Sequence, residues 1–258
     1  MLLFIPGYNC EKQIPRVLNQ ITPEIAQFFD EVIFVNNRST DHTEQAVLNY
    51  KTPKWFPKFR ILRNDHNYGL GGSHKVAFDY AIKHDYDYIV ILHGDDQGNI
   101  NDLLPILKSK SYRKYDAVLG ARFMPKSTLK GYSKFRTFGN RVYNHLFSLV
   151  THKRIYDLGS GLNLYKVSSL KNNFYHKFPD HLTFNYCMIL ATHYYHHKIK
   201  FFPISWREDD QKSNVKLFSQ AFTVLGIMNK YAINHNYIKS ELRDHPIKQY
   251  TYQEVKHA

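Results

Sequence analysis

The sequence has few cysteines and no long apolar run, and each absence excludes a class of protein. Cys10 and Cys187 are the two cysteines among 258 residues, which excludes a disulfide framework or a cysteine-rich zinc site and is typical of a reducing cytoplasm. No run reaches about 18 apolar residues, so we expect no membrane-spanning helix. Residues 2–5 are apolar, but this run ends at Pro6-Gly7 and is too short to be a signal peptide. We therefore expect a cytoplasmic protein.

Acidic residues are also scarce relative to basic ones. The chain has 22 Asp and Glu against 35 Lys and Arg, for a net charge of +13. This positive field favours an anionic partner such as a sugar nucleotide, a lipid phosphate, an anionic membrane or a nucleic acid. A nucleic-acid-binding module is supported by charge alone, because no recognised binding motif accompanies it, and we expect no nucleic-acid partner.

Short β-rich runs alternate with helical patterns over the first two thirds of the chain, which is typical of βαβ units. We expect strands at 2–5, 31–35, 60–62, 88–92, 117–120 and 201–206. We expect helices at 14–28, at 74–84, over much of 126–154 and at 217–233, and one more that Ser39-Thr40-Asp41 caps and that runs through Ala46 and Leu48. The pattern predicts an α/β fold with a mostly parallel central sheet flanked by helices. Residues 1–216 would form the catalytic domain, and 217–258 a helical extension with a loosely held tail after His235.

The sharpest chemical signal is the run His93-Gly94-Asp95-Asp96-Gln97, which directly follows the apolar strand at 88–92. Open α/β sheets bind ligands beyond the carboxyl ends of their strands, so Tyr8, Asn36 and Asp95 should converge on one crevice. An acidic turn in that place can hold Mg²⁺ or Mn²⁺ against a diphosphate. The alternative is a plain surface turn, which favours the same residue types.

Four ordered motifs carry a family resemblance: 5–9 (IPGYN), 36–43 (NNRSTDHT), 67–72 (NYGLGG) and 93–97 (HGDDQ). They resemble the family-2 glycosyltransferases, especially dolichol-phosphate mannose synthase and its bacterial polyprenyl-phosphate relatives. Further matches at 120–123, 136–144, 157–161 and 206–207 extend the resemblance over about residues 1 to 220. It implies a GT-A fold and an inverting, metal-assisted transfer from a UDP- or GDP-linked sugar to a polyprenyl-phosphate or surface-glycan acceptor.

The resemblance also implies roles for individual residues. Asp95 would be the principal ligand of Mg²⁺ or Mn²⁺ and Gln97 would support it. His93 stands where the family has an acid, so it is either a ligand that favours Mn²⁺ or an outer-shell contact. The implied catalytic residues are Asp95, Asp157, Arg122 and Arg207, with Asp157 and Asp180 as candidate bases. The implied nucleotide-sugar contacts are Pro6, Tyr8, Asn9, Glu11, Asn36, Gly69, Gly71, Lys75, Gly94, Arg136, Ser213 and Lys216.

Two of these positions carry alternatives. Asn36 stands where the family normally has an Asp that reads the base, so the preferred base can differ. Lys75 would face the diphosphate or, alternatively, solvent. These departures leave open a catalytically altered relative that binds sugar nucleotide without efficient transfer. A sugar-nucleotide-forming nucleotidyltransferase is disfavoured, because residues 6–10 do not supply the Gly-rich loop with Arg and Lys that it needs.

The acceptor side of the enzyme is less constrained. No Glu-Asp pair stands at the usual later position, which favours a lipid-phosphate acceptor, since an ionised phosphate needs no general base. The helix expected at 217–233 would dock in the core, form a homodimer contact or lie in a membrane interface as a peripheral anchor. His193, His196 and His197, on an expected helix, are interpreted as surface or helix-end residues.

Overall fold

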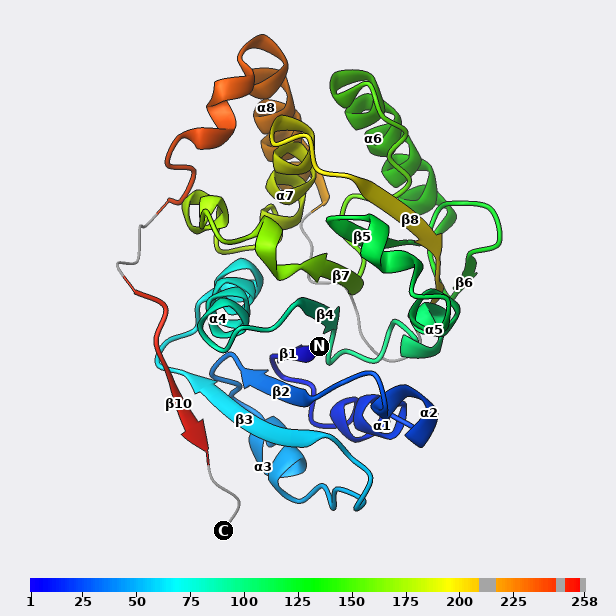
Figure 1. Cartoon of the computed structure of the whole chain (residues 1–258). Coiled ribbons are helices and arrows are strands. Elements are labelled where there is room, and N and C mark those ends of the chain that lie inside the picture. Colours follow the sequence, from blue (N-terminus) through cyan, green and yellow to red (C-terminus); the bar gives the residue numbers. More distant parts are fainter. Residues whose placement is uncertain (209–216, 245–248, 256–258) are drawn as a thin grey trace.

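A computed structural model of the chain describes residues 1–208, 217–244 and 249–255, and it contains an eight-stranded sheet between helices (Figure 1). The strand order is β10-β3-β2-β1-β4-β7-β5-β8. The strands of this sheet are β1 (Leu2–Gly7), β2 (Glu31–Asn36), β3 (Lys58–Asn64), β4 (Tyr88–Leu92), β5 (Ala117–Ala121), β7 (Leu162–Lys166), β8 (Ile199–Pro203) and β10 (Tyr252–Val255). A second, two-stranded sheet pairs β6 (Thr128–Lys130) with β9 (Ser205–Arg207).

The sheet is parallel from β3 through β2 and β1 to β4, and β5 is parallel to β8. β7 is antiparallel to both β4 and β5, and β10 is antiparallel to β3. The mostly parallel α/β sheet expected from the sequence is therefore confirmed. The expected strand at 201–206 is wrong as a single element, since β8 ends at Pro203 and β9 begins at Ser205 in the other sheet.

The helices cover both faces of the sheet and depart from expectation where proline and glycine occur. Pro23 lacks a backbone N–H and starts a new helix, so the helix expected at 14–28 is two short ones. The helix expected from His74 begins at Gly69. Within the expected cap Ser39-Thr40-Asp41, Asp41 is the residue whose side chain contacts the start of α3, since its Oδ1 accepts from the backbone N–H of Thr43. The helices are α1 (Ile14–Asn19), α2 (Pro23–Ala26), α3 (Thr43–Leu48), α4 (Gly69–Lys83), α5 (Leu104–Lys108), α6 (Lys134–Thr151), α7 (Phe184–Tyr194) and α8 (Leu217–Ile233).

Short 3₁₀ turns complete the elements at η1 (Ile100–Leu103), η2 (Ser111–Lys114), η3 (Val167–Ser169), η4 (Phe174–Lys177) and η5 (His235–Lys239). The helix expected at 217–233 is confirmed as α8. Of the three clustered histidines, His193 lies on α7, whereas His196 and His197 follow its end.

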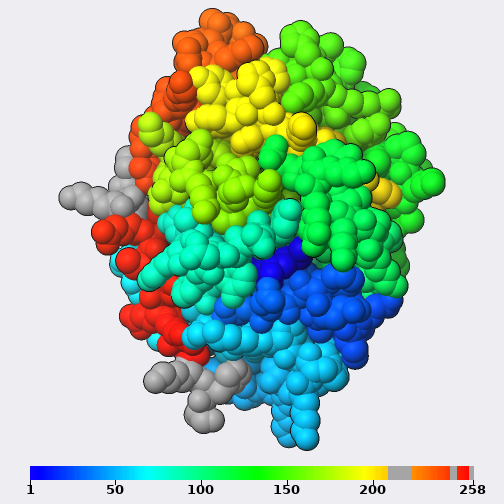
Figure 2. All heavy atoms as spheres, in the orientation of Figure 1, coloured from blue at the N-terminus to red at the C-terminus, as the bar shows by residue number. Residues whose placement is uncertain are grey.

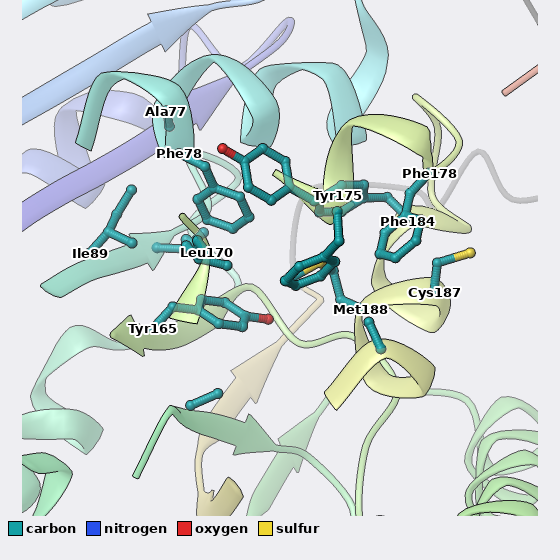
Figure 3. Close-up of a cluster of buried hydrophobic side chains, with 14 of the residues drawn as sticks. Ala77, Phe78, Ile89, Tyr165, Leu170, Tyr175, Phe178, Phe184, Cys187 and Met188 are labelled. Atoms are coloured by element: carbon teal, nitrogen blue, oxygen red, sulfur yellow. The ribbon is translucent and has the colours of Figure 1, made fainter. Parts of the chain in front are cut away.

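Two apolar cores lie on the two faces of the sheet, because alternate residues of a strand point to opposite faces. Leu2 and Phe4 of β1 join one core, and Leu3 and Ile5 join the other. Figure 3 shows the first core where Phe78 of α4 meets Tyr175 and Phe184.

The first core also takes in the end of the chain. Val224, Ile227 and Tyr231 of α8 and Tyr250 are buried in it. Tyr250 and β10, which lie in the tail expected to be loosely held, are therefore structural parts of the fold. The boundary expected at 216 falls where residues 209–216 lie outside the described chain.

Candidate active site

The carboxyl ends of β1, β2 and β4 meet at one edge of the sheet. The N–H of Asn37, just past β2, donates to Gly7 O at 2.9 Å, and the N–H of Gly94, past β4, donates to Pro6 O at 3.0 Å. A Cβ at Gly94 would lie 2.8 Å from Pro6 O, so this crossing requires glycine. Tyr8 extends from the junction with 48% of its surface exposed.

The loops after β1 and β2 are tied to each other by polar side chains. Asn9 Oδ1 accepts from the N–H of Thr40 at 2.8 Å, and Glu11 Oε2 accepts from the N–H of His42 at 3.0 Å. Asn9 and Glu11 thus hold the two loops together. The ring of Tyr8, between these loops and the strand ends, is exposed.

The amide of Asn36 is used inside the protein. It is buried, its Oδ1 accepts from the N–H of Ser39 at 2.9 Å, and its Nδ2 donates to Glu44 Oε2 at 2.8 Å. Glu44 Oε1 in turn accepts from Arg63 at 3.2 Å. The expected direct reading of a base by Asn36 is not what this geometry offers. Glu44 and Arg63, which the sequence did not single out, are the partly exposed polar groups beside it.

The two neighbouring carboxylates of the acidic turn have opposite surroundings. Asp95 is half-buried beside the Arg122 and Glu208 charges, and burial raises its pKa to about 6. Asp96, with a positive φ of 59°, turns into the protein and is 2% exposed. Its carboxylate accepts from Arg16 Nε at 2.6 Å, from Gln20 Nε2 at 2.8 Å and from Arg207. Asp95 is therefore the carboxylate that is available to a ligand.

His93 packs behind this turn. Its ring lies 5.9 Å from the ring of His74, and its Nε2 is buried without a hydrogen-bond partner among the described residues. Burial and the Arg122 charge lower the pKa of His93 to about 4, so its ring is neutral at pH 7.

A divalent ion would find one protein carboxylate here. Nowhere in residues 1–208, 217–244 and 249–255 do three His, Cys, Asp or Glu side chains converge. Asp95 could bind Mg²⁺ or Mn²⁺ if diphosphate oxygens and water supplied the other ligands, which suits the oxygen preference of both ions. Gln97 presents its backbone to this turn, since its N–H donates to Asp95 Oδ1 at 3.2 Å and its carbonyl accepts from the N–H of Arg207.

Comparison with known proteins identifies the family. The sequence profile described as "Glycosyl transferase family 2" matches residues 3–174. The chain belongs to glycosyl transferase family 2.

Two relatives of known name agree with this assignment. The chain is 24% identical, over 66% of its length and 70% of the relative's, to a UDP-N-acetylglucosamine–dolichyl-phosphate N-acetylglucosaminyltransferase of Methanococcus voltae. It is 25% identical, over 94% of its length and 76% of the relative's, to a dolichyl-phosphate beta-glucosyltransferase of Trichomonas vaginalis.

Among solved structures, a UDP complex of glucosyl-3-phosphoglycerate synthase from Mycobacterium tuberculosis superposes with a TM-score of 0.62 at 14% identity, covering 90% of this chain and 79% of that one. S. aureus TarS superposes with a TM-score of 0.59 at 17% identity, and the chain spans 65% of its length. The fold is that of the GT-A glycosyltransferases.

Both candidate bases of this family-2 glycosyltransferase are held by cations. Asp157 is 2% exposed and accepts from Arg122 Nε and a second guanidinium nitrogen, both at 2.8 Å. The N–H groups of Arg122 and Gly159 donate to the same carboxylate. Asp180 accepts from Lys75 Nζ at 2.6 Å. With its oxygens engaged in this way, Asp157 anchors Arg122.

Lys75 is neither solvated nor directed at a diphosphate. It is fully buried, and its ammonium reaches Phe178 O and Asp180. Gly71 likewise meets the protein's own backbone: its N–H donates to Asp180 O at 2.7 Å, and a Cβ there would lie 2.4 Å from Pro179 O. Gly69, with a φ of +70°, is packed in the same way. In this family-2 glycosyltransferase, Gly69, Gly71 and Lys75, which were expected to contact the nucleotide, join α4 to residues 178–180.

The basic side of the site contains a carboxylate that the sequence reasoning missed. Glu208 Oε2 accepts from Arg136 at 2.6 Å, and the Arg136 guanidinium lies 4.5 Å from the centre of the Tyr132 ring. Arg207 Nε donates to Asp96 O at 2.8 Å, so it braces the acidic turn. The run Trp206-Arg207-Glu208 at the end of a strand was the available signal for Glu208. Ser213 and Lys216 lie outside the described residues.

Proposed function

We propose that this glycosyltransferase moves one sugar from a UDP- or GDP-linked donor to a polyprenyl-phosphate acceptor, with inversion at the anomeric carbon and a divalent ion on the donor diphosphate. The observation that carries the proposal is the half-buried Asp95, directly after β4 at the meeting point of three strand ends, beside Arg122 and Glu208. The two curated relatives named above, a dolichyl-phosphate N-acetylglucosaminyltransferase and a dolichyl-phosphate glucosyltransferase, support the acceptor class. A surface-glycan acceptor remains the alternative.

The proposed reaction is a direct displacement. An acceptor phosphate oxygen attacks the anomeric carbon while the bond from that carbon to the donor diphosphate breaks, and the electron pair leaves with the diphosphate. An ion held by Asp95 would offset the charge that develops on the leaving group. An ionised phosphate needs no base, which agrees with the engagement of Asp157 and Asp180 by cations.

The acceptor phosphate has a candidate cation in Arg136. A guanidinium binds phosphate oxygens in a bidentate manner, and Arg136 lies near the start of α6 with a side chain that is 21% exposed. Because Glu208 occupies this guanidinium, the acceptor phosphate would have to compete with a carboxylate for it.

An apolar stripe on α6 supports a peripheral membrane contact. Phe135, Phe138, Val142 and Leu149 are 72%, 69%, 42% and 57% exposed. Phe138, Val142 and Leu149 follow Phe135 by about three, seven and fourteen residues. At about 100° per residue, these spacings place all four side chains on one side of the helix. With the net charge of +13, this stripe suits an anionic lipid surface, which would bring a lipid-linked acceptor to Arg136 on the same helix.

α8 is a weaker candidate for this contact, because Val224, Ile227 and Tyr231 bury much of it in the core. Within the described residues, no helix is long and apolar enough to cross a membrane.

The transfer is tested with a panel of UDP- and GDP-sugars and a short-chain polyprenyl phosphate, in the presence of Mn²⁺ or Mg²⁺. We expect a product whose anomeric configuration, read by NMR, is opposite to that of the donor. Asp95→Asn should lower turnover by about 100-fold or more through loss of the ion. Turnover that survives EDTA and Asp95→Asn would contradict the metal role, and tight nucleotide binding without transfer would favour the catalytically altered relative.

The membrane contact is tested by vesicle flotation. The Phe135→Ser/Phe138→Ser double variant should bind anionic vesicles at least about tenfold more weakly than the parent protein, because two exposed rings no longer enter the lipid. Phe222→Ser on α8 is the matched control, since Phe222 is 76% exposed and lies off the stripe. Unchanged flotation would contradict the membrane contact, and a concentration-dependent dimer abolished by the double variant would assign the stripe to a contact between two copies.

A further inference from the structure

Lys75 is a buried cation that joins three distant segments of the chain. It has no exposed surface, and its ammonium donates to Phe178 O at 2.5 Å, Asp180 Oδ1 at 2.6 Å and Tyr250 OH at 3.0 Å. A buried ammonium is costly unless it is paired and its protons are bonded, and these three acceptors satisfy it. The ammonium of Lys75 thereby joins α4 to residues 178–180 and to the C-terminal segment, which is residues 249–255.

The C-terminal segment also holds the turn that precedes α4. Thr251 donates its N–H to Tyr68 OH at 3.2 Å and accepts from the N–H of Asp65 at 3.1 Å. The rings of Tyr68 and Tyr250 meet edge to face at 5.3 Å. Figure 2 shows this red segment lying against the cyan residues of β3 and α4.

The turn before α4 is hydrogen-bonded in turn to the strand ends of the active site. The N–H of Tyr68 donates to Asn37 Oδ1 at 2.8 Å, and Asn64 Nδ2 donates to the same oxygen at 3.0 Å. Asn37 in turn donates its N–H to Gly7 O at 2.9 Å. On α4, the ring of His74 lies beside that of His93, two residues before Asp95.

We infer that Tyr250, with Lys75 and Thr251, is a positioning residue for the donor nucleotide. It acts through Asn37 and through residues 64–72, which comprise the end of β3, the turn and the start of α4. These residues set the spacing of the β1 and β2 ends. The inference rests on the proposed function, because it takes the strand ends to be the nucleotide site. The family profile matches residues 3–174, so Asp180, Tyr250 and Thr251 lie outside the matched region.

The test is Tyr250→Phe in the full-length protein, which keeps the ring and removes the hydroxyl that contacts Lys75, Asp180 and Arg243. We expect the calorimetric Kd for UDP or GDP with Mn²⁺, and the KM for the donor, to rise about fivefold to tenfold while kcat changes by less than about twofold. Amide hydrogen exchange should accelerate over residues 64–72. Tyr231→Phe is the matched control, because it removes another buried hydroxyl, the one that contacts His193 Nδ1 at 2.7 Å on α7.

Tyr250→Phe could leave both the nucleotide Kd and the amide exchange over residues 64–72 unchanged. The contacts of Tyr250 with Lys75 and Asp180 would then only stabilise the fold, whatever the melting temperature of the variant. If this variant does not fold, Tyr68→Phe carries the same test, since it removes only the contact with Thr251. The two proposals fail separately. A wild-type protein that binds neither UDP nor GDP contradicts the proposed function, whereas a wild type that binds and a variant that binds equally contradict the positioning role.

Discussion

Asp95 and Asp96 carry the same side chain at adjacent positions but perform different tasks. The left-handed backbone at Asp96 turns its carboxylate into the protein, where it joins Arg16 of α1 to Arg207 of β9. Asp95 keeps a half-buried carboxylate beside Arg122. The acidic turn therefore places a structural anchor and a partly exposed carboxylate at adjacent positions.

This separation predicts opposite effects of two isosteric substitutions. Asp96→Asn should lower the free energy of unfolding by about 1–3 kcal/mol. This loss is smaller than that for breaking a fully buried ion pair, because the side chains of Arg16 and Arg207 are 42% and 44% exposed and solvent screens their charges. Asp95→Asn should leave the free energy of unfolding unchanged or raise it, because burial already disfavours its charge. Urea unfolding of both variants at pH 7 without metal checks this. Equal destabilisation by the two would show that Asp95 also has a structural partner.

At the residue scale, sequence alone could place Asp95, because its position after an apolar strand is local information. It could not assign Lys75, whose partners lie 103, 105 and 175 residues away. A lysine early in an expected helix looks solvated until the fold brings Asp180 and Tyr250 to it. Glu208 was missed for the same reason, since its partner Arg136 is 72 residues away.

Among the elements, Glu31 at the start of β2 joins several neighbours to the parallel sheet. It is 2% exposed and accepts hydrogen bonds from Arg60 of β3, Tyr80 of α4 and Tyr86. Burial opposes ionisation of Glu31, but these donors outweigh burial and lower its pKa below the usual 4.5. The ionised carboxylate therefore stabilises the junction.

The sign of this shift predicts a pH-dependent effect of Glu31→Gln. A lowered folded-state pKa contributes stability that is present above pH 4.5 and is lost as the pH falls through the folded value. The variant should be less stable than the parent by about 1–3 kcal/mol at pH 7, and the difference should shrink below pH 4.5. Denaturant titrations at several pH values measure it. Glu254→Gln is the matched control: Glu254 contacts the same Arg60 but is 46% exposed, so a pH-dependent loss as large as that of Glu31→Gln would contradict the role of burial.

Element types were predictable where the pattern was long and regular, as at β4 and α8. Boundaries failed where a glycine or proline has a role set by tertiary structure. Gly69, Gly71 and Gly72 looked like a loop, yet they form the first turn of α4 because the backbone of 179–180 packs on them. β7 and β10 were missed, since a short antiparallel strand is defined by the neighbour that it pairs with.

For the whole molecule, the question is whether residues 217–258, which the sequence predicts to be a helical extension and tail of the catalytic domain, can be separated from that domain. Val224, Ile227, Tyr231, Ile238 and Tyr250 are all buried in the core that α4 and α7 share. Each such side chain contributes about 1.5–3 kcal/mol, so together they approach the roughly 5–15 kcal/mol by which a domain is stable.

A chain cut after residue 216 should consequently fail to fold as a cooperative unit, because it would expose this face of the core and leave Lys75 without Tyr250. Circular dichroism with a thermal melt and limited proteolysis, performed on the truncated and full-length proteins in parallel, measure this directly. A truncated chain with native secondary structure and a sharp melt would establish the extension as separable. It would also require that the ammonium of Lys75 be satisfied by Phe178 O and Asp180 alone.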